Sequence, residues 1–322
     1  MNISKLSRRR FFQSLFGGAA AAGISIKFNP LEALAKSLRS TVEMPTRPLG
    51  KTGHQVKIFS LGGQATLEKP GTLDESVAIV NRAIDLGVNY IDTAAAYGRG
   101  ISETYIGEVM KTRRKEVFLA SKTNDRSYDG SMRLLEQTLK HLQTDKLDLW
   151  QLHNVRFQED LDKIFAKDGA IKALEKARDE KIIRFLGITG HYDPFVLRKG
   201  IEQYPFDSLL MALNAADKHN ASFQTNLLPY AVEKKMAIIG MKIPARGRIF
   251  RDGGLTSMEP AMRYTLTFPV STIIVGISTI KELEENIRIA QNFKPCTPEE
   301  MAKLENLTKP YFADATWFNK PV

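Results

Sequence analysis

Short apolar runs and amphipathic segments alternate along most of this 322-residue chain, and this alternation constrains the fold more than any other feature. Eight apolar runs have the length and composition of buried strands, and each one precedes a segment with helical spacing. The expected strands are 56–61, 88–91, 117–121, 147–152, 183–188, 208–213, 237–241 and 272–275. The expected helices are 73–86, 103–111 (capped by Ser102), 131–142, 170–180, 194–201, 227–233, 261–266 and 280–290. Such alternation predicts a parallel sheet.

The number of strand–helix units and the chain length distinguish between two architectures with parallel sheets. Eight strand–helix units in a chain of this size favour a closed (β/α)8 TIM barrel. The alternative is an open, doubly wound sheet, which usually carries a G-x-G-x-x-G turn after its first strand. The sequence there is Gly62-Gly63-Gln64-Ala65 and lacks that pattern. We therefore predict an α/β protein with a single-domain barrel over residues 49–322, preceded by a polar linker over residues 36–48.

The first 35 residues have the composition of an export signal. Ser7-Arg8-Arg9-Arg10-Phe11-Phe12 forms a basic head, residues 15–26 form an alanine-rich apolar run, and Ala33-Leu34-Ala35 gives a small-x-small pattern. Together these parts predict a cleavable signal peptide over residues 1–35. The alternative is an uncleaved membrane anchor, but the apolar run is shorter than the roughly 20 residues that a bilayer requires.

The adjacent arginines before two phenylalanines resemble the twin-arginine (Tat) signal. This resemblance implies recognition by the Tat translocase and a periplasmic location. The Tat route carries proteins that are already folded, often with a cofactor inside. We expect no stable membrane insertion after cleavage.

Charge and cysteine content exclude several other classes of protein. The formal net charge is +10, of which residues 1–35 contribute +4, so the mature part carries about +6. Its basic residues are interleaved with acids and form no one-sided stripe with stacking aromatics, so we expect no nucleic-acid partner. Cys296 is the only cysteine, which excludes an intrachain disulfide or a cysteine-held cluster. The five histidines show no metal-binding spacing, so we expect no metal site.

Polar residues gather where three consecutive expected strands end. Asp92 follows the second strand with Tyr97 five residues later, Lys122 follows the third strand, and His153 follows the fourth. The carboxyl ends of barrel strands form the rim that carries the chemistry of this fold. Each residue alone has a structural explanation, as a turn aspartate, a rim tyrosine, a snorkelling lysine or a core histidine. Four of them on neighbouring strand ends indicate a catalytic site.

These four residues match the catalytic tetrad of the aldo-keto reductases. Residues 92–103, Asp-Thr-Ala-Ala-Ala-Tyr-Gly-Arg-Gly-Ile-Ser-Glu, resemble the family's D-T-A-x-x-Y-G-x-G-x-S-E signature. Residues 276–286 resemble its closing cofactor motif, and the similarity extends over residues 47–293. The resemblance implies a TIM barrel and a nicotinamide-dependent oxidoreductase that interconverts carbonyl compounds and alcohols.

Reduction of a carbonyl needs a hydride on carbon and a proton on oxygen. We expect Tyr97 to donate the proton, with its pKa lowered from about 10 by the ammonium of Lys122. Asp92 is expected to keep Lys122 charged and oriented, and His153 to donate to the carbonyl oxygen or share the proton relay. No side chain supplies a hydride, so it must come from a nicotinamide.

The resemblance also implies which residues bind the cofactor. Those that match the family's positions are Thr189, Asn214, Gly276, Ser278, Glu285 and Asn286. Gly276 and Ser278 match the phosphate end, and Glu285 and Asn286 the adenine contacts. The family often has Lys or Arg after that serine, on the 2′-phosphate of NADP, whereas this chain has Thr279. We expect NADP(H) in preference to NAD(H).

Two further motifs depart from the family. Thr189-Gly190 stands where the family usually has Ser-Asn, and Met241-Lys242-Ile243-Pro244 stands where an aromatic residue often stacks on the nicotinamide. The sequence still predicts an exported enzyme that reduces an aldehyde or ketone. The alternatives are a cofactor-binding redox sensor or partner subunit with little turnover, and a barrel scaffold without catalysis.

Specificity for the small carbonyl substrate is expected to depend on loops such as residues 155–167 and 245–256. These loops contain no motif that identifies the substrate. Four arginines in these loops are interpreted as surface charge, with attraction of an anionic substrate as the alternative. They are Arg156, Arg246, Arg248 and Arg251.

Overall fold

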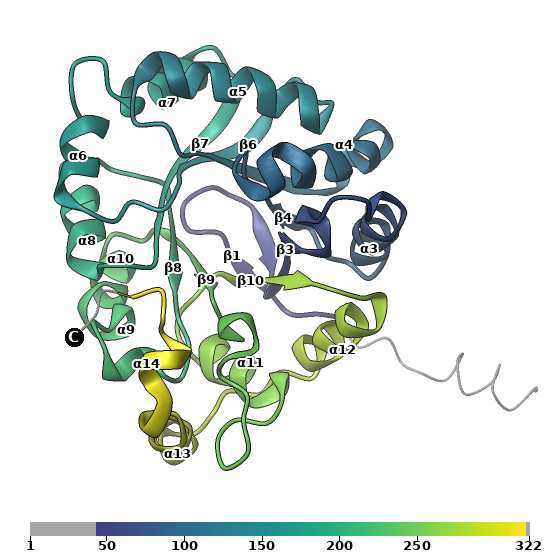
Figure 1. The fold of residues 1–322 in the computed structure, drawn as a ribbon, viewed down its shortest axis with the longest axis vertical. Coiled ribbons are helices and arrows are strands. Elements are labelled where there is room, and N and C mark those ends of the chain that lie inside the picture. The colour runs from purple at the N-terminus through teal and green to yellow at the C-terminus, as the bar shows by residue number, and fades with distance from the viewer. Residues whose placement is uncertain (1–42, 320–322) are drawn as a thin grey trace, which may run out of the picture. The chain divides into compact units, whose positions relative to one another are not determined.

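A computed structural model describes residues 43–319 of the chain. The signal peptide expected over residues 1–35 lies outside these residues, as does the first part of the expected linker. Eight parallel strands close into a barrel in the order β10-β3-β4-β5-β6-β7-β8-β9 (Figure 1). They are β3 (Phe59–Ala65), β4 (Tyr90–Asp92), β5 (Phe118–Thr123), β6 (Leu147–Leu152), β7 (Ile183–Gly190), β8 (Ser208–Ala212), β9 (Ala237–Met241) and β10 (Thr272–Ile277).

A helix follows every barrel strand, and the helices form a ring outside the sheet (Figure 1). They are α3 (Leu73–Asp85), α4 (Ile101–Arg113), α5 (Tyr128–Leu142), α7 (Ala170–Asp179), α8 (Pro194–Gln203), α10 (Leu228–Glu233), α11 (Met258–Thr267) and α12 (Ile280–Gln291). The predicted (β/α)8 barrel is thereby confirmed, and the open sheet is wrong. Within residues 43–319, no helix combines the length and apolar character needed to cross a bilayer.

The apolar side chains form two cores, one between strands and helices and one inside the barrel. The inner core includes Leu149, Leu210, Ile239 and Ile274, one residue from each of four strands. In each strand every second side chain points into the barrel. Because this layer fills the barrel, the strand ends above it form the floor of a cavity rather than the entrance of a channel.

A short hairpin closes the bottom of the barrel, and only its first strand falls within residues 36–48, the predicted linker. β1 (Thr46–Pro48) pairs antiparallel with β2 (Gln55–Lys57). Leu49 and Val56 are buried in the inner core, and burial of each such side chain stabilises the fold by about 1.5–3 kcal/mol. The expected strand 56–61 is therefore two elements, since Val56 belongs to the hairpin and Phe59 begins β3.

The N-terminus of α4 differs from its prediction. Gly100, with a left-handed φ of 91°, is the capping residue, and Ser102 lies inside the helix. The Ser102 hydroxyl donates to the Gly63 carbonyl oxygen at 2.7 Å and lies 2.8 Å from the Thr93 hydroxyl. A Cβ on residue 63 would lie 2.6 Å from that hydroxyl, so the contact requires glycine. Ser102 thus ties α4 to β3 and to the end of β4. In the sequence, β4 precedes Tyr97 and α4 follows it.

Within the described residues, four additional α-helices lie outside the eight repeating units. They are α6 (Gln158–Ile164), α9 (Phe223–Asn226), α13 (Pro298–Thr308) and α14 (Phe312–Ala315). Glu305 on α13 accepts hydrogen bonds from Tyr264 of α11 and from Lys218, which fastens the C-terminal segment to the barrel. Trp317 in that segment reaches the cavity at the strand ends.

Candidate active site

The four predicted catalytic residues stand at the carboxyl ends of neighbouring strands. Asp92 is the last residue of β4, Lys122 is next to last in β5, and His153 follows β6 directly. Tyr97 begins a short 3-10 turn after β4, in which Gly98 has a φ of 57° and so favours glycine. All four residues line one cavity.

The Lys122 ammonium connects two of the other three residues. It donates to Asp92 Oδ1 and, at 2.7 Å, to the Thr93 carbonyl oxygen, and it lies 3.4 Å from the Tyr97 hydroxyl. Asp92 and Lys122 are both fully buried. The ring of His153 meets the Tyr97 ring edge-on, with centroids 5.5 Å apart. The structure therefore brings the phenol, ammonium, carboxylate and imidazole together.

The buried ion pair holds a positive charge beneath the phenol. Burial lowers the pKa of Lys122, but the Asp92 carboxylate and the Tyr97 phenol outweigh it, so the pKa of Lys122 is raised overall. Burial also raises the pKa of Asp92, against the opposing influence of Lys122. Removal of either partner would leave an unpaired buried charge, which typically costs about 3–5 kcal/mol. Lys122 is thus fixed as an ammonium.

The pKa of Tyr97 moves in the opposite direction to the expected one. Burial raises it, and the nearby ammonium of Lys122 only partly offsets that effect. The sequence reasoning considered the charge and not the desolvation of the phenolate. At neutral pH the residue is therefore a protonated phenol, the form that a proton donor needs.

The imidazole of His153 is neutral. Burial, together with the positive charges of Lys122 and other nearby groups, holds its pKa well below the usual range. A neutral imidazole has one N–H and one lone pair, so it can donate to or accept from a bound ligand without adding charge.

Gln151 belongs to this arrangement and was missed by the sequence reasoning. Its side-chain amide donates to Asp92 Oδ2 at 3.1 Å, so both oxygens of that carboxylate are held. Gln151 is fully buried on β6. The available signal was its position two residues before His153, because alternate residues of a strand share one face.

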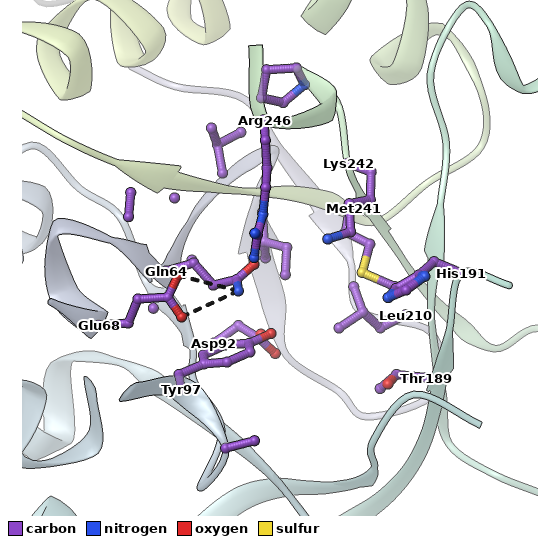
Figure 2. A pocket seen from close by; sticks show the side chains of 18 of the residues that line it. Gln64, Glu68, Asp92, Tyr97, Thr189, His191, Leu210, Met241, Lys242 and Arg246 are labelled. Atoms are coloured by element: carbon purple, nitrogen blue, oxygen red, sulfur yellow. Dashed lines mark hydrogen bonds between the residues drawn. The ribbon is translucent and has the colours of Figure 1, made fainter. Parts of the chain in front are cut away.

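The cavity above the tetrad has a volume of about 810 Å³ (Figure 2). Three of the predicted cofactor residues line it, namely Thr189 at the end of β7, Gly276 in β10 and Ser278 just after β10. Thr189 also accepts a hydrogen bond from the backbone N–H of Asn154 at 2.9 Å, which ties the ends of β6 and β7 together.

The other three predicted cofactor residues do not line this cavity. The Asn214 amide is engaged with the backbone, donating to the Lys242 carbonyl oxygen at 3.1 Å and accepting from the Ala216 N–H at 2.9 Å. These contacts indicate that Asn214 fixes the loop after β9. The sequence predicted that Asn214 contacts the cofactor. Glu285 and Asn286 lie further along α12, where Glu285 is exposed and Asn286 is buried.

The four loop arginines separate into three groups. Arg248 and Arg251 both form salt bridges with Asp314, and Arg156 stacks on Tyr192 with its guanidinium 4.5 Å from the ring centroid. These three fit the predicted surface role. Arg246 instead lines the cavity, together with four residues that the sequence reasoning did not assign to it: Glu68, His191, Lys242 and Trp317.

Across residues 43–319, no three His, Cys, Asp or Glu side chains gather in a way that could hold a metal ion. Cys296 is buried and far along the sequence from the tetrad.

A closed barrel with this polar cluster at its mouth defines an α/β-barrel oxidoreductase of the kind that the sequence motifs predicted. The model of the aldo/keto reductase family matches residues 59–252. The chain belongs to the aldo/keto reductase family and is an NAD(P)-dependent oxidoreductase.

Two curated relatives match over nearly their full length. The chain is 27% identical over 313 residues to the uncharacterized oxidoreductase YqkF of Bacillus subtilis, covering 83% of this chain and 97% of the relative. It is 26% identical over 312 residues to L-galactose dehydrogenase of Arabidopsis thaliana, covering 84% and 96%.

Solved structures share the fold. A holo aldo-keto reductase from Bacillus halodurans matches with a TM-score of 0.70 at 24% identity, covering 82% of this chain and 96% of that one. An aldo-keto reductase from Klebsiella pneumoniae in complex with NADPH matches with a TM-score of 0.68 at 21% identity, covering 82% and 95%.

Proposed function

We propose that this chain is an exported enzyme that reduces a small aldehyde or ketone to an alcohol, with NADP(H) used in preference to NAD(H). The observation that carries the reaction is the position of the Lys122 ammonium, bonded to Asp92 and 3.4 Å from the Tyr97 hydroxyl at the floor of the cavity. A charged group in that position stabilises the phenolate that remains after the phenol gives up its proton.

The residues that line the cavity fit a nicotinamide dinucleotide. Gly62, Gly63 and Gly276 expose backbone on the wall formed by β3 and β10, next to the lining residues Gln64 and Val275. On this wall a Cβ at residue 276 would lie 3.2 Å from the backbone of Gln64. Ser278 follows this wall and precedes α12, whose N-terminus favours anions. The wall suits a flat ring and the helix start suits phosphate, so we assign the phosphate end of the cofactor to Gly276 and Ser278.

The preference for NADP(H) rests on two weaker supports. Lys281 is exposed in the first turn of α12, close to Ser278 in the sequence. The Klebsiella pneumoniae reductase with the same fold is described as a complex with NADPH. Glu285 and Asn286 are proposed as adenine contacts further along α12, outside the cavity.

The chain's own residues account for the proton. Reduced nicotinamide, when bound, supplies the hydride that adds to the carbonyl carbon. The Tyr97 hydroxyl donates its proton to the carbonyl oxygen, so that the products are the alcohol and the oxidised nicotinamide. Lys122 stabilises the resulting phenolate, and Asp92 keeps Lys122 in place. His153, as a neutral imidazole, donates its N–H to the carbonyl oxygen and holds it toward the phenol during the transfer. Solvent reprotonates the Tyr97 phenolate after the alcohol has formed.

Export by the Tat translocase to the periplasm is the second part of the proposal. It rests on Ser7-Arg8-Arg9-Arg10-Phe11-Phe12 and the apolar run that follows. An enzyme that folds around a bound nicotinamide before export would leave the cytoplasm with its cofactor in place.

The reaction is tested with the purified chain, each reduced cofactor and simple aldehydes, by the loss of absorbance at about 340 nm. Turnover with NADPH, at a higher kcat/KM than with NADH, is the expected result. If the protein binds NADPH but no aldehyde or ketone oxidises it, the reductase proposal fails and a redox sensor takes its place.

A further inference from the structure

Lys242 is a cation in the cavity whose charge the tetrad does not explain. It follows β9 directly, is half-buried, and lines the same cavity as Tyr97 and His153. Within residues 43–319, no salt-bridge or hydrogen-bond partner lies within bonding distance of its ammonium. Arg246, four residues further along the same loop, is the other cation of this loop in the cavity. The loop thus contributes two positive charges to a site where the tetrad already contains an ammonium.

The acids that line the cavity are each engaged elsewhere. Asp92 is bonded to Lys122, and Glu282 accepts from the backbone N–H of Ser278 at 2.8 Å. Glu68 lies across the cavity, with the Gln64 amide 3.4 Å from its carboxylate (Figure 2). Glu68 influences Lys242 over a distance without contacting it. The charge on Lys242 is therefore left for a ligand.

The side chain of Lys242 points to one particular part of the cavity. Its ammonium lies 5.8 Å from the ring centroid of Trp317 and 5.7 Å from that of Phe318, in the C-terminal tail. The carbonyl of Phe318 in turn approaches a ring nitrogen of His191, after β7, at 3.4 Å. Two aromatic residues, an imidazole and an ammonium thus form one corner of the site.

This corner lies away from the proposed phosphate end of the cofactor. Gly276 and Ser278 belong to β10 and the start of α12. Lys242 follows β9, which pairs with β10, but its ammonium lies beside the tail residue Phe318, whose carbonyl approaches His191 after β7. Strands β8 and β9 separate β7 from β10 in the barrel. Arg246 extends instead toward Gln64 on β3 (Figure 2). The two cations of the loop consequently face different parts of the ligand space.

The loop holds these side chains at a conformational cost. Lys242, Ala245 and Arg246 have left-handed φ values of 64°, 48° and 55°. This region of φ is unfavourable for residues that carry a Cβ. The Asn214 amide bonds to the Lys242 carbonyl and stabilises the turn. Strain of this kind is retained where the surrounding structure fixes a side chain in a required position.

We propose that Lys242 determines specificity by binding a carboxylate on the substrate, so that the enzyme acts on aldehydes or ketones that carry a carboxylate group. This inference rests on the proposed reductase function and adds the substrate class to it. The rings of Trp317 and Phe318 flank the ammonium, and the carbonyl at the other end of the substrate reaches Tyr97. A hydrogen bond to a charged group in such surroundings contributes about 1.5–3 kcal/mol, or roughly 10- to 150-fold in affinity.

The test compares 4-carboxybenzaldehyde with its methyl ester, a neutral aldehyde of similar shape. The measured quantity is the ratio of their kcat/KM values with NADPH, in the unchanged chain, in Lys242→Met and in Lys303→Met. Lys303 is an exposed lysine of α13 outside the cavity and serves as the matched control. We expect the ratio to favour the acid in the unchanged chain and the control, and to fall at least about 10-fold in Lys242→Met.

A second measurement does not depend on turnover. Binding of terephthalate and of its dimethyl ester to the NADP-loaded chain is measured by calorimetry. We expect terephthalate to bind more tightly, and this preference to be lost in Lys242→Met. Equal binding of the two compounds overturns the inference, even if both aldehydes are reduced. A Lys242→Met variant that loses NADPH affinity while its aldehyde ratio is unchanged also overturns it, because the lysine then serves the cofactor.

These results separate the two proposals. If neither aldehyde is reduced but terephthalate binds through Lys242, the reductase function fails while the carboxylate site stands. If both aldehydes are reduced without preference, the reductase function stands and the carboxylate site fails.

Discussion

The ammonium nitrogen of Lys122 lies 3.4 Å from the hydroxyl oxygen of Tyr97, and the same nitrogen is bonded to Asp92. This relationship joins residues from β4, the turn after it and β5. It also explains why burial of the phenol does not prevent proton transfer. The desolvation that raises the pKa of Tyr97 strengthens the attraction between the phenolate and Lys122 once the proton has left.

Tyr97→Phe removes the proposed proton donor and leaves the ring in place. We expect kcat to fall by about 10²–10⁴-fold, the usual contribution of general acid catalysis. Affinity for NADPH, measured by fluorescence titration, is expected to change little. A variant that reduces aldehydes at the parent rate would remove Tyr97 from the reaction.

Gln151→Leu tests whether the second hydrogen bond to Asp92 matters. Without the Gln151 amide the pKa of Asp92 rises further, because burial already raises it and one opposing contact is lost. A carboxyl with a raised pKa loses its charge at a higher pH, so less Lys122 ammonium is held in place on the acid side. We expect the acid limb of the kcat profile to move to higher pH, together with a loss of about 1.5–3 kcal/mol in unfolding free energy.

Ser208→Ala is the matched control for that variant. Ser208 is buried in the next strand but one from Gln151, and its hydroxyl has no hydrogen-bond partner within residues 43–319. Its removal should leave the pH profile where it was. If both variants lower stability equally and neither shifts the profile, Gln151 acts only in packing.

The barrel could be predicted because each of its units has its own local signal. The runs 147–152 and 237–241 correspond to β6 and β9 without any shift, because buried parallel strands are mostly apolar on both faces. Asp148 and Gln151 are the polar exceptions in β6. The convergence of Asp92, Lys122 and His153 followed from the same reasoning, because parallel strands bring their carboxyl ends to one rim.

The features that could not be predicted depend on contacts between distant parts of the chain. Serine is a common helix-capping residue, but the Ser102 hydroxyl donates a hydrogen bond to the Gly63 carbonyl oxygen instead. In the sequence, Lys242 was noted only as one residue of a segment that differs from the family motif. Its position beside Trp317 depends on contact with a C-terminal segment more than 70 residues further along the chain. Desolvation of Tyr97 likewise requires knowledge of what surrounds it.

Arg8→Lys combined with Arg9→Lys tests the proposed export route. The twin-arginine signal is read by its receptor as an arginine pair, so conservation of charge should not rescue it. We expect the full-length precursor to accumulate in the cytoplasm on cell fractionation. Arg10→Lys keeps the Arg8-Arg9 pair and should export normally, and unchanged export of the double variant would show that another signal is used.

The charge on Lys242 should make substrate recognition depend on pH. Burial lowers its pKa to about 8, helped by Arg246 and Lys122 and opposed by Glu68. The other titratable groups that face it are His153 and His191. Burial and nearby positive charge lower the pKa of both imidazoles, that of His191 to about 4, so both are neutral at pH 7 and above. Neither histidine therefore changes charge between pH 7 and 9.

An ammonium is charged below its pKa and neutral above it, so carboxylate binding is present at pH 7 and is lost as the pH rises through about 8. We expect KM for 4-carboxybenzaldehyde to rise between pH 7 and 9, while KM for the methyl ester follows only changes common to both aldehydes. In Lys242→Met the two KM values should vary in parallel across this range. Parallel variation in the unchanged chain would mean that Lys242 does not contact the carboxylate, whatever else it contributes to the cavity.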